Sequence, residues 1–318
     1  MNDLRMNERA WTMAEQCIAR ADELRIAVHT LSSGSVVIDA GIGVTGGLGA
    51  GIALAELCMG GLGHVTLTSL TIGGEAWPGV QVWTDHPAES CMASQYAGWA
   101  INPPEFFAIG SGPLRAKARV ERELFGKLGY EEDASRGVLV LEGRTLPTDA
   151  VAEWVAHKAG VPSGALIFAI APTASLAGGI QIAARVIETG LHKMDALGFD
   201  VRRVMSASGS SPWPPIARND VRAIGRTNDC ILYGGQARYV VRAEDDELAE
   251  LARRLPATTS PDYGTPFHDI FKRYASDFYK IDPMLFSPAE VSLASSTSGR
   301  TFHAGRVNVD VLRQSLFS

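Results

Sequence analysis

An arginine and a glutamate three positions apart are the residues of this sequence best suited to do chemistry together. Arg185 and Glu188 lie in the stretch 177–197, whose apolar residues recur at helical spacing. Residues three apart share one face of a helix. In a cleft, a guanidinium keeps a neighbouring carboxylate ionised, and the carboxylate can then take a proton from water. The alternative is a solvated helix face with an exposed ion pair, which adds little to stability.

A glycine inside the same predicted helix needs its own explanation. Gly190 follows Glu188 by two positions. Glycine in a helix interior costs roughly 0.5–1 kcal/mol relative to alanine, and it usually has a packing or functional reason. Gly190 therefore favours a helix with a close neighbour or a functional role.

A glycine-rich segment is the second candidate for chemistry. Gly41–Gly46 reads GIGVTG, which matches GxGxxG, and it lies between a predicted strand and a predicted helix. An NAD-binding loop also needs an acidic residue about 20 positions later, at the end of the second strand. The next predicted strand, 64–72, has no carboxylate before Glu75. Three interpretations stay open: an NAD-dependent oxidoreductase, tight glycine turns, or another ligand held by backbone amides.

Composition excludes several classes of partner. The 318 residues include 29 Lys and Arg against 35 Asp and Glu, a net charge of −6, which disfavours nucleic acid and anionic membrane surfaces. The longest apolar stretch, 165–172, is far shorter than the ~20 residues of a membrane helix, and no signal-peptide pattern begins the sequence. The four cysteines form no CxxC motif, and the histidines lack metal-ligand spacing. We expect a soluble, cytoplasmic protein with reduced, buried thiols and no metal.

The elements that must position these residues alternate between strands and helices. Strands are expected at 26–31, 35–40, 64–72, 138–143, 164–172 and 201–206, and helices at 8–24, 89–101, 147–158, 177–197 and 244–255. The segment CILYGGQARYVVRA resembles a hairpin around Gly234 and Gly235. This mixture predicts an α/β fold with a mixed sheet rather than a doubly wound parallel one. A turn-rich boundary near Arg144 divides the chain into a larger domain, 1–146 plus 285–318, and a second domain, 147–284.

Six blocks along the sequence together resemble one family, the methenyltetrahydromethanopterin cyclohydrolases. They run in the family's order and span most of the chain. The blocks are SQYAGWAI (94–101), AIGSGPLRA (108–116), ARVIETGLHKM (184–194), AIGRTNDCILYGG (223–235), PDYGTPFHDIF (261–271) and FYKIDPMLFSPAEV (278–291).

The resemblance implies a fold and a reaction. Such enzymes are two-domain α/β proteins with a pterin site in the interdomain cleft, commonly assembled as homotrimers. They hydrolyse 5,10-methenyltetrahydromethanopterin reversibly to the 5-formyl compound and use no metal or nucleotide cofactor. The same step serves formaldehyde oxidation in methylotrophic bacteria. A non-catalytic pterin-binding protein is a further alternative.

The resemblance also assigns roles to residues. Arg185 and Glu188 match the family's catalytic arginine and glutamate, so Glu188 is expected to activate water beside the cationic methenyl carbon while Arg185 tunes it. A basic patch, Arg115 to Arg122, is either a solvated helix face or a site for the substrate's acidic tail. The expected substrate-binding residues are Gln95, Tyr96, Ser111, Arg226, Thr227, Asn228, Asp229 and Tyr263.

Two positions depart from the family's pattern. Tyr96 stands where archaeal members carry a lysine, and the segment 292–300 has serines where an asparagine is expected. Both differences fit a bacterial, methylotroph-type member that uses a shorter-tailed pterin carrier.

Overall fold

The computed structural model describes residues 4–275 and 277–317, which form two compact units. The first unit comprises the chain up to Gly63 and Glu89–Gln181, and the second comprises His64–Ala88 and the chain from Ile182 onward. These limits differ from the expected 1–146 plus 285–318 and 147–284. Strand pairing is the physical reason, because a strand belongs with the sheet that completes its backbone hydrogen bonds. Residues 166–171 pair within the first sheet, and residues 79–84 pair within the second.

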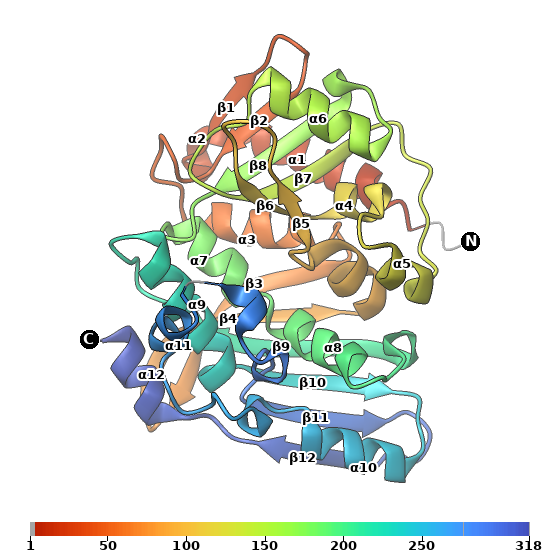
Figure 1. The fold of residues 1–318 in the computed structure, drawn as a ribbon, viewed down its shortest axis with the longest axis vertical. Coiled ribbons are helices and arrows are strands. Elements are labelled where there is room, and N and C mark those ends of the chain that lie inside the picture. The colour runs from red at the N-terminus through yellow and green to blue at the C-terminus, as the bar shows by residue number, and fades with distance from the viewer. Residues whose placement is uncertain (1–3, 276, 318) are drawn as a thin grey trace. The chain divides into compact units, whose positions relative to one another are not determined.

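The first unit is built on a mixed sheet with the order β1-β2-β8-β7-β6-β5 (Figure 1). The three central strands β2, β8 and β7 are parallel, whereas β1, β6 and β5 are antiparallel to their neighbours. The strands are β1 (Ala27–Thr30), β2 (Val36–Asp39), β5 (Trp99–Ile101), β6 (Ala108–Ser111), β7 (Gly137–Glu142) and β8 (Leu166–Ala171).

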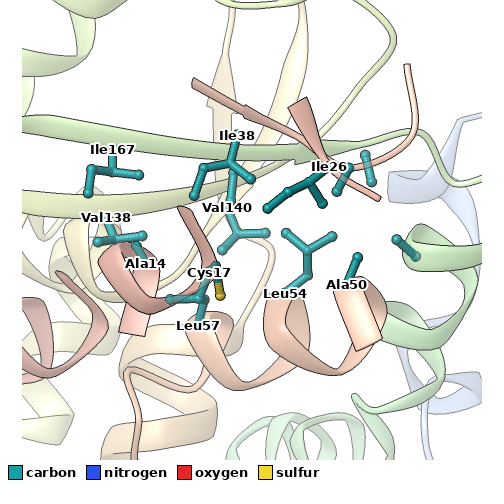
Figure 2. Packing of buried hydrophobic residues seen from close by; sticks show 14 of the residues in the cluster. Ala14, Cys17, Ile26, Ile38, Ala50, Leu54, Leu57, Val138, Val140 and Ile167 are labelled. Carbon is teal, nitrogen blue, oxygen red and sulfur yellow. The ribbon is translucent and has the colours of Figure 1, made fainter. Parts of the chain in front are cut away.

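Helices cover both faces of this sheet. The helices are α1 (Met6–Ala19), α2 (Ala21–Leu24), α3 (Leu48–Cys58), a π-helix (Ala88–Gln95), α4 (Pro113–Ala118), α5 (Arg122–Leu128), α6 (Asp149–Ala159) and α7 (Leu176–Ala183). Figure 2 shows one core layer, in which Ile38, Val138 and Ile167 of the sheet lie near Leu54 and Leu57 of α3. The adjacent strand residues face α6 on the other side. Burial on both faces explains why β7 and β8 read as continuous apolar runs.

The second unit contains a second mixed sheet, with the order β12-β11-β10-β9-β4-β3. Strands β10 and β11 form a parallel pair, while β9 is antiparallel to both β4 and β10. The elements are β3 (Gly63–Ile72), β4 (Glu75–Thr84), α8 (Val186–Ala196), β9 (Val204–Pro212), α9 (Asp220–Gly234), β10 (Gln236–Val241), α10 (Asp245–Arg254), α11 (Phe267–Arg273), β11 (Glu290–Ser295), β12 (Thr301–Gly305) and α12 (Val309–Leu316). Two mixed sheets with helices confirm the expected mixed α/β class.

Helix α8 packs on one face of this second sheet. A Cβ on Gly209 of β9 would lie 2.8 Å from Val186 of α8, and Gly209 is paired with Val82 of β4. Neighbouring residues of a strand point to opposite faces. Trp83 therefore lies on the face away from α8, where it is 45% exposed and stacks on His64.

Several expected elements differ in the structure. The helix expected at 89–101 is a π-helix over Ala88–Gln95, followed by strand β5 (Trp99–Ile101). The hairpin at 230–243 is wrong, because its first half, Cys230 to Gly234, is the buried end of helix α9 and only its second half forms a strand. A short apolar run cannot be assigned to a strand or a buried helix by periodicity alone. The single helix at 177–197 is interrupted between Ala183 and Val186.

The four cysteines, Cys17, Cys58, Cys91 and Cys230, are buried and free, which confirms the expectation of buried thiols. Among the helices of the described residues, none has the length and apolar character needed to cross a bilayer.

Candidate active site

The interruption between α7 and α8 places the arginine and the glutamate at the start of a helix. Arg185 is the N-cap of α8, with φ −83° and ψ 7°, and its amide bonds to the carbonyl of Ile182 at 3.0 Å. Its own carbonyl accepts the first helical hydrogen bond, from Thr189, at 3.0 Å. Glu188 consequently lies in the first turn of α8. The positive end of the helix dipole is favourable for a carboxylate at that place.

Both side chains are buried, so this is not a solvated face. Arg185 is 7% exposed and Glu188 is 5% exposed. An ionised carboxylate is rarely buried unless polar or charged groups surround it. The two buried, oppositely charged groups three residues apart form a polar site at the start of α8.

Close packing against the second sheet fixes the position of α8. A Cβ on Gly190 would lie 1.9 Å from the hydroxyl oxygen of Tyr239, which donates a hydrogen bond to the carbonyl of Ile187 at 3.0 Å. The glycine in this helix therefore has a packing reason. The side chain of Tyr239 is fully buried, so any residue larger than glycine must displace it.

A buried lysine ties the same helix to two short 3₁₀ helices, Ala257–Thr259 and Pro283–Leu285. Lys193 donates to the carbonyls of Pro256 and Met284 at 2.8 and 2.5 Å and to the Thr259 hydroxyl at 2.8 Å. Burial lowers the pKa of Lys193 to about 7, although Asp282 opposes this shift. Lys193 anchors α8 one and a half turns beyond Glu188.

In the first unit, Gln95 and Tyr96 lie at the end of the π-helix. Gln95 is fully buried and Tyr96 is half-buried, with its ring 4.8 Å from the guanidinium carbon of Arg115. π-helices are rare and occur frequently at functional sites. The structure thus gives this predicted binding segment an unusual backbone.

Ser111, another predicted binding residue, belongs to a small buried polar cluster in the same unit. Its hydroxyl lies 3.3 Å from the sulfur of Cys58, and the amide of Gln181 lies 3.4 Å from the same sulfur. The hydroxyl of Ser94 donates to the carbonyl of Cys58 at 2.6 Å. These contacts bring the ends of β6, α3 and the π-helix together.

In the second unit, helix α9 carries four of the predicted binding residues with different surroundings. The Thr227 hydroxyl and the Asn228 amide donate to carbonyls one turn earlier in α9, at 2.9 and 2.8 Å. Such bonds satisfy the side chains locally. Arg226 is half-buried, and its guanidinium reaches the carbonyl of Pro215 at 3.5 Å.

Asp229 connects three helices of the second unit. Its fully buried carboxylate accepts from the amide of Phe267 at 2.8 Å and from the hydroxyl of Ser315 at 2.5 Å. Burial raises the pKa of Asp229 to about 7. These bonds join α9 to α11 and α12, which is a structural function for this residue.

Tyr263, the last predicted binding residue, is half-buried and packs on Tyr233 with ring centroids 5.0 Å apart. Burial raises the pKa of the Tyr263 hydroxyl. Its contact with pterin stays a prediction, as do those of the other seven residues.

The glycine-rich loop is organised around a carboxylate of the protein itself. Asp39, at the end of β2, accepts hydrogen bonds from the amides of Gly41, Ile42 and Gly43 at 2.9, 2.7 and 2.7 Å. Gly46 has φ 61°, and a Cβ there would lie 2.1 Å from the carbonyl oxygen of Ala40. Because three amides of the loop already bind Asp39, the loop is a tight turn rather than a phosphate cradle.

The basic patch at 115–122 separates into one buried arginine and several surface residues. Arg115 is 0% exposed, so a tail-binding or solvated role is wrong for this residue. The region also forms two short helices, α4 and α5, instead of one. Within the described residues, no three His, Cys, Asp or Glu side chains gather as a metal site.

Comparison with known protein families decides which reaction this scaffold serves. A family model described as Cyclohydrolase (MCH) matches residues 5–316. The chain belongs to the methenyltetrahydromethanopterin cyclohydrolase family. Membership makes it a hydrolase of tetrahydromethanopterin one-carbon metabolism.

Individual family members from bacteria and archaea are similar over their whole length. The methenyltetrahydromethanopterin cyclohydrolase of Methylobacillus flagellatus is 45% identical over 311 residues, which cover 98% of this chain and 94% of that protein. Those of Methanosarcina barkeri and Methanocaldococcus jannaschii are 40% and 41% identical, each covering 98% of this chain and 97% and 98% of the relative. The six sequence blocks therefore identify the family correctly.

Sequence reasoning did not find two residues that shape this cyclohydrolase scaffold. Asp39 carried no motif beyond its place before the glycine loop, although aspartate is a common acceptor for nearby backbone amides. Arg115 was hidden among neighbouring charges, and only the apolar and small residues around it, Leu114 and Ala116, suggested burial.

Proposed function

We propose that Glu188 is the general base of the cyclohydrolase reaction and that Arg185 assists it. The methenyl bridge of the substrate is an amidinium-like cation that adds water. Glu188 takes a proton from that water as its oxygen bonds to the methenyl carbon. The bond from the methenyl carbon to N10 then breaks as the added oxygen becomes the formyl carbonyl. N10 takes up one of the two protons of the water, and the other is released, which gives the 5-formyl compound.

The burial of both charged groups at the start of α8 supports this proposal. A carboxylate with 5% exposure is shielded from bulk water. Its attraction to a cationic carbon is stronger in that shielded environment than it would be in water. Arg185 is the N-cap of the same helix, three residues before Glu188, and its guanidinium can orient the attacking water.

The experiment is the change Glu188→Gln, which keeps the size of the side chain and removes its basicity. We expect kcat to fall by about 10²- to 10⁴-fold, the usual contribution of a general base. Loss of the methenyl chromophore measures turnover, and urea denaturation checks the fold. Glu123→Gln is the matched control, because Glu123 lies in the first turn of α5 with a side chain 90% exposed. A Glu188→Gln enzyme that keeps the wild-type rate contradicts the proposal.

For substrate binding, we propose Gln95, Tyr96 and Ser111 from the first unit, together with Arg226, Thr227, Asn228, Asp229 and Tyr263 from the second. The rare backbone of the π-helix that ends at Gln95, directly before Tyr96, gives the strongest support. Pterin binding by the wild-type protein without any turnover would favour the non-catalytic alternative.

We further propose a cytoplasmic homo-oligomer, a trimer by resemblance, that serves formaldehyde oxidation. The free, buried state of the four cysteines fits a reducing compartment. Light scattering tests the assembly, because a mass equal to one 33.9 kDa chain contradicts it.

A further inference from the structure

One of the largest fully buried side chains in the described residues is an arginine, and it lies beside a predicted binding segment. Arg115 of α4 is 0% exposed. Its Nε and Nη2 atoms lie 3.0 and 2.9 Å from Oε1 of Glu121. An arginine is buried completely only when charged and polar partners accept its hydrogen bonds.

The same guanidinium caps the end of the π-helix. Its Nη1 donates to the carbonyls of Met92 and Ala93 at 3.0 and 2.7 Å. The carbonyl of Ser94 accepts from the amide of Gly112 at 2.7 Å, and that of Cys91 accepts from the amide of Tyr96 at 2.8 Å. The last carbonyls of a helix have no partner within it and attract a cation. Arg115 and its loop thus satisfy the carbonyls that precede Gln95.

The residues after the π-helix also pack on this arginine. The guanidinium carbon lies 4.8 Å from the ring centroid of Tyr96 and 5.2 Å from that of Phe125. A Cβ on Gly98 would lie 1.7 Å from Oε1 of Glu121, so the chain passes directly over the ion pair. Lysine could not replace these contacts, because only a planar guanidinium combines several directed hydrogen bonds with stacking on a ring.

We infer that Arg115 is the positioning residue that holds Gln95 and Tyr96 in place for substrate binding. It acts through the carbonyls of Met92 and Ala93 and through the ring of Tyr96, and it does not itself touch the substrate. The inference rests on the proposed binding role of Gln95 and Tyr96. It goes beyond that role by naming the residue on which the geometry of the segment depends.

The test compares Arg115→Lys with the wild type in steady-state kinetics. We expect KM to rise between about tenfold and a hundredfold with kcat nearly unchanged, because misplaced binding groups weaken uniform binding. A merely structural role would lower the amount of active enzyme and leave KM unchanged. Hydrogen exchange should also become faster at residues 92–97 of the lysine variant.

Three further variants separate the possible outcomes. Arg136→Lys is the matched control, and its KM should not change. Arg136 also stacks on an aromatic ring, with its guanidinium carbon 4.8 Å from the ring centroid of Trp11, and it pairs with Glu8 at 2.6 Å. If Arg115→Lys does not fold, Glu121→Gln, which keeps the acceptor and removes its charge, should raise KM by a smaller factor. Gln95→Ala tests the binding role alone. If KM is raised in Gln95→Ala but normal in the Arg115 and Glu121 variants, our inference about Arg115 is overturned. If KM is normal in Gln95→Ala, the binding role of Gln95 itself is overturned.

Discussion

Replacing Gly190 by alanine should destabilise the protein, although alanine is the better helix former. In an open helix the change would stabilise by about 1 kcal/mol. Here the new Cβ would lie 1.9 Å from the Tyr239 hydroxyl oxygen and 2.9 Å from its ring carbon Cζ. The buried ring must move, and its 3.0 Å hydrogen bond to the Ile187 carbonyl must break or lengthen.

The magnitude follows from these opposing effects. Overpacking a core costs about 1–3 kcal/mol, and a buried hydroxyl left without its partner costs about 1–3 kcal/mol more. After subtracting the gain of about 1 kcal/mol in helix propensity, we expect the free energy of unfolding to fall by about 3 kcal/mol. In a domain of this size the melting temperature should fall by roughly 6–12 °C. Because α8 also carries Arg185 and Glu188, turnover should decrease too.

Urea denaturation followed by circular dichroism measures the change. Gly126→Ala is the control, because Gly126 is an exposed residue of helix α5 and a Cβ there meets nothing within 4 Å; this variant should be slightly stabilised. Adding Tyr239→Phe to Gly190→Ala removes the closest atom, so the double variant should lose less than the sum of the two single changes. If Gly190→Ala is as stable as Gly126→Ala, the packing argument is refuted.

Two buried ionisable groups, Asp229 and Lys193, should change the free energy of unfolding with pH in opposite directions. Urea denaturation between pH 4 and 10 measures both effects. Asp229 has a pKa of about 7 in the folded protein and an ordinary pKa of 3.8. As pH rises between these two values, Asp229 loses its proton in the unfolded state but keeps it in the folded state. The free energy of unfolding therefore falls with rising pH across this interval. Asp229→Asn, which can still accept from Phe267 and donate to Ser315, should abolish that fall. Lys193 has a folded pKa of about 7 and an ordinary value of 10.5, so its contribution to the free energy of unfolding rises with pH across that interval. Lys193→Met should remove the rise and, by leaving the carbonyls of Pro256 and Met284 without a donor, lower stability by about 1–3 kcal/mol. Unchanged pH profiles in these variants would contradict the assigned titrations.

The local sequence pattern was sufficient to predict structure where a segment's own residues determine its conformation. The apolar runs of β7 and β8 predicted buried strands, and burial on both faces of the sheet is the reason. The spacing of Arg185 and Glu188 correctly associated both with one helix, of which Glu188 lies in the first turn and Arg185 is the N-cap. Six blocks in order identified the family. Gly190 indicated a close packing neighbour, because a glycine in a helix interior is unfavourable and usually has a packing or functional reason.

Partners distant in the sequence decided the rest. The exposure of Arg185 and Glu188 depends on the elements that pack around α8. The spacing of residues in the sequence does not identify those elements. Asp39 closes the glycine loop, Asp229 joins α9 to α11 and α12, and Arg115 caps the π-helix from 22 positions away. A charged residue has the same identity on the surface and in the core. Only the tertiary structure supplies the acceptors and donors that allow it to be buried, and those contacts decide its function.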